Sequence, residues 1–322
     1  MQGRNGMEGK ILKYERGAMA LGVFGSVCYR FDLFGLSAKH YAVLVVFCLY
    51  FCLGRYIMEC TTAPPMNDPH TYCKRILPNK RKKSLVCLGD SITHQGLSGE
   101  FVRMLREARE DLDVVNCGQN SILTHTVLKE RVAWVNACKP DYVNLMIGTN
   151  DVKGIYKKEW GEGSKVTWHI NEDISYEQFG SNFERILESL YTGGSAKIIV
   201  CTLPPMGEDL SCAANEHIKK ANAIILKICK KYRASNRVVV ADVFTSLSEY
   251  LNKNTTAEYR KKGLKVDNFE SVGPACALKK YVLGKDYDEI GRASGLRLMI
   301  DALHLNTTGA AIVAKDILKE LK

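Results

Sequence analysis

The sequence SLVCLGDSITH, residues 84–94, decides the fold because it joins a short apolar run to a polar turn. Four consecutive apolar residues, 85–88, are typical of a strand that is buried on both faces. The turn that follows contains Gly89 and Asp90 and leads to a hydroxyl side chain, that of Ser91. In a parallel sheet the loops after the strands gather at one edge, where ligands bind. We therefore expect Ser91 to lie at a functional edge.

Four more apolar runs follow along the chain, at residues 114–117, 142–147, 197–202 and 238–243. Between them apolar residues recur every three or four positions, as on the buried face of an amphipathic helix. The helical sets are Phe101, Leu105 and Leu112; Leu128, Val132 and Val135; Tyr176, Phe179, Phe183, Ile186 and Leu190; and Val313, Ile317 and Leu321. Strands that alternate with helices predict an α/β fold with a parallel sheet covered on both faces.

Three further polar motifs stand where strands or loops meet the same edge. Residues 116–120 (NCGQN) follow the second apolar run, and residues 148–151 (GTND) follow the third. Residues 301–306 (DALHLN) precede the last helical set. Because the carboxyl ends of parallel strands share one edge, we expect these motifs and Ser91 to meet there.

Ser91, Asp301 and His304 are the residue types of a catalytic triad. A serine hydroxyl becomes a good nucleophile only when a base takes its proton, and that base needs a partner that fixes its tautomer. Asp301 precedes His304 by three positions, so the carboxylate can bind one ring nitrogen while the other faces Ser91. We assign the oxyanion donors to the backbone N–H groups of Ser91 and Gly118 and the side-chain amide of Asn150.

Together, GDS at 89–91, Gly118, GTND at 148–151 and the Asp301-x-x-His304 pair resemble the four blocks of SGNH/GDSL hydrolases, in the branch that reads GDSITH. Residues 203–209 (LPPMGED) and 305–306 also resemble segments of that branch. The resemblance covers residues 84–322 and implies a flavodoxin-like three-layer α/β/α sandwich. It also implies hydrolysis of esters or thioesters without a metal or another cofactor, with a small-molecule or lipid ester as substrate.

Two departures from the family pattern concern the region around His304. Ala302 stands where the family often has glycine, and we expect the Asp301–His304 geometry to survive this change. Residues 254–298, rich in Lys and Gly, lie between the last apolar run and Asp301. They form either a lid over the site or a surface elaboration.

Other interpretations remain open. Taken singly, Ser91 and Asp301 are good helix caps, and Gly118 and Asn150 are good turn residues. His94 follows Ser91 by three positions but has no carboxylate partner beyond Asp90, so we expect it only to line the pocket. The same triad also serves acyltransferases and carbohydrate deacetylases. A membrane-tethered binding protein that has lost catalysis is the alternative outside enzymes.

Composition limits the remaining possibilities. The chain has 322 residues, 46% hydrophobic and 25% charged, which fits one globular domain with an additional segment. Part of the net charge of +10 is concentrated in a basic cluster without interleaved aromatic residues, which argues against a nucleic-acid partner. Its members are Lys74, Arg75, Lys80, Arg81, Lys82 and Lys83. The 12 cysteines lack metal-ligand spacing, and we expect buried free thiols rather than disulfides, and no metal site.

The N-terminal part predicts a membrane anchor. Residues 41–54 are uncharged and apolar, and the apolar character continues to Met58. A span needs about 20 apolar residues, so Lys39 and Arg55 must reach toward the head groups; a buried helix is the alternative. We therefore divide the chain into an N-terminal segment (1–40), a single-pass anchor (41–58), a basic proline-containing linker (59–83) and the hydrolase domain (84–322). The basic cluster favours a cytosolic domain over a lumenal one.

Overall fold

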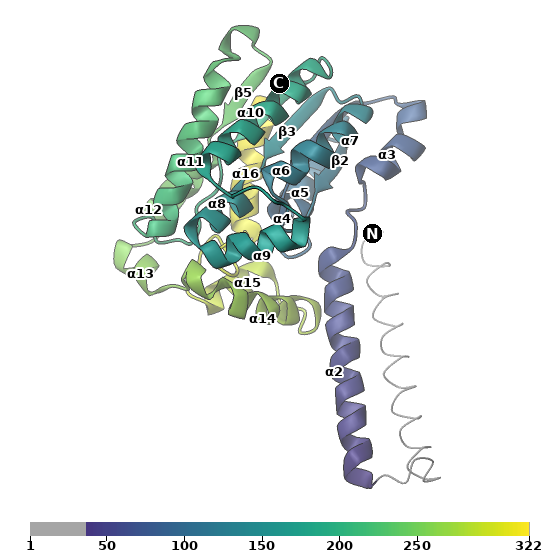
Figure 1. Cartoon of the computed structure of the whole chain (residues 1–322), viewed down its shortest axis with the longest axis vertical. Coiled ribbons are helices and arrows are strands. Elements are labelled where there is room, and N and C mark those ends of the chain that lie inside the picture. Colours follow the sequence, from purple (N-terminus) through teal and green to yellow (C-terminus); the bar gives the residue numbers. More distant parts are fainter. Residues whose placement is uncertain (1–36, 322) are drawn as a thin grey trace. The chain divides into compact units, whose positions relative to one another are not determined.

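The computed structural model describes residues 37–321, so most of the predicted N-terminal segment, 1–40, lies outside the described residues. The chain divides into two compact units, Met1–Ala63 and Pro64–Lys322. Within the second unit the predicted parallel sheet is confirmed (Figure 1). Its strands are β1 (Lys83–Gly89), β2 (Leu112–Gly118), β3 (Tyr142–Met146), β4 (Lys197–Cys201) and β5 (Val238–Ala241).

The strand order is β2-β1-β3-β4-β5 and every pair is parallel, which is the flavodoxin-like arrangement. In the register, Gly89 at the end of β1 lies opposite Gly118 of β2 and Met146 of β3. Three strands therefore end at the same level, and the loops that follow them start side by side.

Helices cover both faces of this sheet. The α-helices of the second unit are α3 (Pro69–Arg75), α4 (Ser91–His94), α5 (Phe101–Ala108), α6 (Thr124–Thr126), α7 (Val132–Ala137), α8 (Thr149–Tyr156), α9 (Lys158–Trp168), α10 (Tyr176–Thr192), α11 (Ala213–Lys230), α12 (Val243–Asn254), α13 (Ala257–Lys262), α14 (Phe269–Tyr281), α15 (Tyr287–Ala293) and α16 (Thr307–Glu320). Short 3₁₀ turns are η1 (Leu77–Asn79), η3 (Arg233–Ser235) and η4 (Val266–Asn268), and η2 (Val127–Arg131) is a π-helical turn.

Alternate residues of each strand point into two separate cores. Val86 and Leu88 of β1 pack with α7, α10 and α11 on one face, whereas Leu85 and Cys87 pack with α5, α12 and α16 on the other. The predicted helical sets lie in these layers with one exception. Leu112 begins β2 instead of continuing the helix of Phe101 and Leu105, because that helix ends at Ala108 and the chain turns back before the strand.

Residues 64–83, part of the predicted linker, are folded as part of the second unit. Asp68 caps α3 by accepting hydrogen bonds from the backbone of His70 and Thr71. The ring of Tyr72 is completely buried in the core beside the sheet. The side chain of Asn67 donates to the carbonyl of Val114 in β2. The first few residues of the predicted linker belong to the preceding helix, α2, and the second unit begins at Pro64.

Helix α2 (Ala38–Thr62) is the described part of the first unit. The candidate membrane span within it is Lys39–Thr62, which contains an 18-residue window with a mean hydropathy of 1.9 and extends beyond the predicted 41–58 at both ends. A helix of this length rises about 37 Å, which exceeds the ~30 Å hydrocarbon core of a bilayer. By length and composition α2 is thus able to cross a membrane.

Candidate active site

Ser91, His304 and Asp301 form a continuous hydrogen-bonded chain. Ser91 Oγ lies 2.8 Å from His304 Nε2, and His304 Nδ1 lies 2.7 Å from Asp301 Oδ2. Asp301 and His304 are buried, whereas Ser91 is half-buried. The second carboxylate oxygen of Asp301 accepts the backbone N–H groups of Leu303 and His304. The carboxylate is therefore held in place, and it orients the imidazole toward Ser91.

The turn before Ser91 requires close packing of backbone on backbone. A Cβ atom at Gly89 would meet the carbonyl oxygen of Met146 at 2.5 Å, and one at Gly118 would meet the backbone nitrogen of His94 at 2.2 Å. Glycine at these positions lets β3 approach the end of β1, and lets β2 approach the backbone of α4. Asp90 caps α4 by accepting from the N–H of Ile92, and Ser91 stands at the first helical position.

Electrostatics in the site favour a charged imidazole. Burial by itself lowers the pKa of His304, but the charge and the hydrogen bond of Asp301 oppose it, and the resulting pKa is raised above the ordinary histidine value. Burial also raises the pKa of Asp90, against the N–H of Ile92 and the charge of His304. The histidine ring that contacts the Ser91 hydroxyl is that of His304.

Asn150 and Asp151, at the start of α8, attach this helix to the loop after β2. Asn150 is buried and its Nδ2 donates one hydrogen bond to the carbonyl of Ile122, at 3.1 Å. Asp151 accepts the backbone N–H and the hydroxyl of Thr124. Burial raises the pKa of Asp151 to about 7, although both bonds from Thr124 oppose the shift. Asn150 retains a second N–H for another acceptor.

The predicted oxyanion donors differ in how available they are. The N–H of Gly118 already donates to Asn116 Oδ1 at 2.9 Å, so it must leave this partner before it can bind an oxyanion. The backbone N–H of Ser91 has no acceptor within residues 37–321. The N–H of Ser121 has none in that part of the chain either, and Ser121 adopts a left-handed conformation with φ 59° just before Ile122. The sequence did not single out Ser121, since left-handed backbone is uncommon for serine.

Residues 203–209, which follow β4, support the Asp301–His304 segment. Gly207 N–H donates to the carbonyl of Ala302 at 2.7 Å. The carboxylate of Glu208 is buried and accepts the backbone N–H groups of Arg297, Leu298 and Met299 at 2.6–3.1 Å. Burial raises the pKa of Glu208, and these N–H groups oppose the shift. Glu208 is a positioning residue that the sequence analysis did not assign.

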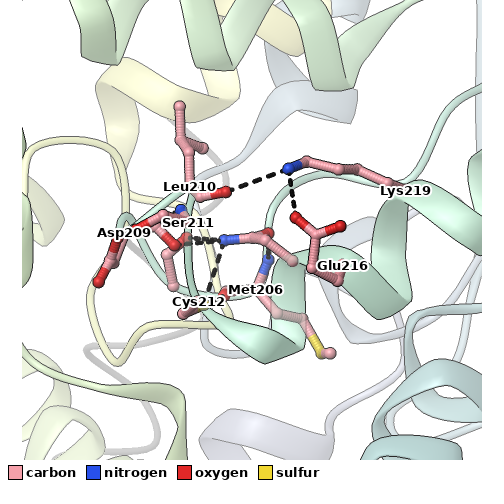
Figure 2. A network of polar contacts seen from close by, with 9 residues as sticks. Met206, Asp209, Leu210, Ser211, Cys212, Glu216 and Lys219 are labelled. Carbon is pink, nitrogen blue, oxygen red and sulfur yellow. Dashed lines mark hydrogen bonds and ion pairs between the residues drawn. The ribbon is translucent and has the colours of Figure 1, made fainter.

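The loop around Glu208 is itself held from α11 (Figure 2). The side chain of Asn215 accepts from the N–H of Met206 and donates to the carbonyls of Gly207 and Asp209. Figure 2 also shows Lys219 paired with Glu216 and donating to the carbonyl of Leu210. One helix thus positions the loop, and the loop positions the segment that carries His304.

Ala302 has a φ of 68°, in the left-handed region that glycine adopts without strain. Its carbonyl still receives the bond from Gly207, and the Asp301–His304 distance remains that of a short hydrogen bond. The expectation that alanine preserves this geometry agrees with the structure. The backbone conformation explains why glycine suits this position.

The segment between α12 and Asp301 is helical and borders the site. Asp267 of η4 accepts the hydroxyl of Tyr156 and pairs with Lys157 at 2.7 Å. The Phe269 ring at the start of α14 lies 5.6 Å from the His304 ring, between centroids. The segment therefore forms a wall of the site. In residues 37–321 no group of three or more His, Cys, Asp and Glu side chains is arranged to hold a metal.

The fold and the site together define an ester hydrolase. Residues 87–312 match the family model described as GDSL-like lipase/acylhydrolase, and the chain belongs to this family. No curated protein sequence matches the chain.

Solved structures share the fold of the second unit. The acetylxylan esterase Axe2 from Geobacillus stearothermophilus is 17% identical, with a TM-score of 0.50 over 74% of this chain and 94% of that one. The acetyl xylan esterase AlAXEase is 19% identical, with a TM-score of 0.51 over 74% and 100%. LAE5, an α/β hydrolase enzyme from the metagenome of Lake Arreo in Spain, is 18% identical, with a TM-score of 0.50 over 74% and 94%.

Proposed function

We propose that this protein cleaves carboxylic esters through an acyl-enzyme intermediate, with Ser91, His304 and Asp301 as its catalytic triad. The observation that carries the proposal is the unbroken hydrogen-bonded chain from the Ser91 hydroxyl through both nitrogens of His304 to the Asp301 carboxylate. This arrangement activates a hydroxyl group in water at neutral pH, because the imidazole accepts the proton as the nucleophile attacks.

The reaction has two halves. Ser91 Oγ attacks the ester carbonyl carbon while its proton moves to His304 Nε2, and His304 then protonates the departing alcohol oxygen. In the second half His304 takes a proton from water, whose oxygen attacks the acyl carbon, and Ser91 recovers its proton as the acid leaves. Asp301 remains ionised and stabilises the imidazolium in both halves.

The oxyanion of each tetrahedral intermediate receives the backbone N–H of Ser91 and the second N–H of Asn150. Gly118 stays in the proposal as a third donor, on the condition that its N–H turns away from Asn116. Ser121, whose N–H has no acceptor among residues 37–321, precedes Ile122, the residue that Asn150 contacts, and is the alternative third donor. Each such donor contributes about 10²–10³ in kcat.

Labelling by a fluorophosphonate probe, combined with hydrolysis of p-nitrophenyl acetate, tests the nucleophile. O-acetyl esters are the first substrates to try, because two of the structural neighbours named above are acetylxylan esterases. We expect Ser91→Ala and His304→Ala to abolish nearly all turnover while the melting temperature stays close to that of the wild type. Ser271→Ala, at an exposed serine of α14, is the matched control. Equal labelling of Ser91→Ala and wild-type protein would refute the assignment.

We also propose that α2 anchors the catalytic domain to a membrane as a single-pass segment. The support is its length, its apolar composition and the exposure of its large side chains, among them Phe47, Tyr50 and Phe51. The basic cluster after the helix favours a cytosolic domain. A signal sequence passes the same test of length and composition, so the size of the mature protein in membranes distinguishes the two.

A further inference from the structure

Lys153 is a cation in an aromatic cradle next to the candidate catalytic residues. It lies on α8 three positions after Asn150, so both side chains occupy one face of the helix. Its Nζ is 5.1 Å from the centre of the Phe269 ring and 5.6 Å from that of Trp160. These distances are those of cation–π contacts. Trp160 is buried, and Lys153 is itself half-buried.

The ammonium group of Lys153 has no polar partner. Nζ makes no hydrogen bond or ion pair with any residue from 37 to 321, although it carries three donors. Lys157, one turn further along, is the natural comparison. It also lies over the Trp160 ring, at 4.6 Å, but it is paired with Asp267 at 2.7 Å. Burial lowers the pKa of Lys153, against the charges of Glu270, Asp90 and Asp301, as expected for a desolvated cation.

Phe269 places this cation beside the catalytic base. The same phenyl ring lies 5.6 Å from the His304 ring and 5.1 Å from Lys153 Nζ. At this separation the charge of Lys153 lowers the pKa of His304, against the larger effect of Asp301. In ester cleavage His304 protonates the oxygen of the departing alcohol. The alcohol part of a bound ester therefore lies on the side of the site that His304, Phe269 and Lys153 share.

We propose that Lys153 binds an anionic group on the alcohol part of the ester and thereby determines substrate specificity. The inference rests on the ester hydrolase function proposed above. The ammonium group of the half-buried Lys153 has lost part of its contact with water, and a carboxylate or phosphate supplies acceptors of the opposite charge in such a partly desolvated site, where charged hydrogen bonds are strongest. The aromatic rings hold the ammonium in place without neutralising its charge, which leaves it available to the substrate.

Three aryl acetates that share one scaffold test the proposal on the full-length chain in detergent. They are 4-acetoxybenzoate, 4-acetoxyphenyl phosphate and the neutral 4-acetoxybenzamide. We expect the wild type to hydrolyse at least one anionic ester with a higher kcat/KM than the neutral ester. The anionic ester with the higher kcat/KM shows whether the site prefers a carboxylate or a phosphate. In Lys153→Met, which keeps the length of the side chain, we expect this preference to fall about tenfold or more. Lys153→Arg keeps the positive charge and should retain most of the preference for the anionic ester.

Lys157→Met is the matched control, because it removes a cation from the same aromatic ring where that cation already has a partner. Its ratio of anionic to neutral turnover should stay within about twofold of the wild type. A wild type without preference for either anion, or a Lys153→Met variant that keeps the preference, would overturn the inference. If the wild type hydrolyses none of the three esters, the proposed function is instead refuted.

Discussion

Glu208 offers the strictest test of how the site is built, because it touches none of the reacting groups. Its carboxylate accepts backbone N–H groups from Arg297, Leu298 and Met299, just before the segment that carries Asp301 and His304. The perturbation is Glu208→Ala, with Glu208→Gln as the conservative variant. Alanine removes every acceptor, whereas glutamine keeps one oxygen in nearly the same volume.

The structure sets the magnitude of the loss. Arg297 is exposed, so water can replace the acceptor of its N–H group, but Leu298 and Met299 are buried. Each buried N–H without a partner costs about 1–3 kcal/mol, so Glu208→Ala should lose about 2–6 kcal/mol of unfolding free energy. For a domain of this size that corresponds to a fall in Tm of roughly 4–24 °C. Glu208→Gln should lose less, since it leaves one acceptor for the two buried groups.

Urea unfolding and ester hydrolysis should be measured on the same preparations. Where the Glu208 variants still fold, we expect kcat to fall while fluorophosphonate labelling slows in proportion, because the imidazole is no longer held against Ser91. Glu216→Ala is the control: its carboxylate belongs to the neighbouring network of Figure 2 but is exposed and pairs with the surface residue Lys219. Such a pair contributes about 0–1 kcal/mol. If Glu208→Ala unfolds at the same urea concentration as Glu216→Ala, the positioning argument is wrong.

Three other predictions concern the oxyanion, the base and the anchor. Asn150→Ala should lower kcat by about 10²-fold or more with a smaller change in KM, and an effect on KM alone would place Asn150 against the ground-state substrate. Activity should rise with pH through an inflection above the ordinary histidine value of 6.5, since the raised pKa keeps His304 protonated to higher pH and only the neutral ring accepts a proton. A flat profile across this range, or inactivation by a chelator with recovery on added zinc, would argue against His304 as the base. The full chain should sediment with membranes and resist extraction by alkali. Removal of residues 1–63, which keeps Asn67 and Tyr72, should release a soluble active domain. Recovery of the full chain in the soluble fraction would contradict the proposal that α2 is a membrane anchor.

The local patterns of the sequence predicted most of the architecture. All five apolar runs became strands within about two residues of the predicted bounds, because a strand buried on both faces must be apolar throughout. Ser91, Asn150 and His304 were selected since each motif follows a strand or precedes a helix, and a parallel sheet brings such positions to one edge. Leu112 was misassigned because an apolar residue at helical spacing is equally compatible with the start of the next strand.

What the sequence determined by itself was therefore the class of fold and the identity of the groups at the sheet edge, since both depend on residues that are neighbours along the chain. The tertiary structure alone decided how these groups are supported. Glu208 contacts Leu298 across 90 positions, and the Phe269 ring contacts both His304 and Lys153. No local sequence pattern predicts these contacts. The tertiary structure also showed that the N–H of Gly118 is already bonded to Asn116, while that of Ser121 has no acceptor in the described part of the chain. The reason is physical: apolar periodicity reports which side of an element is buried, but hydrogen bonds and charge contacts depend on which distant segments the packed layers bring together.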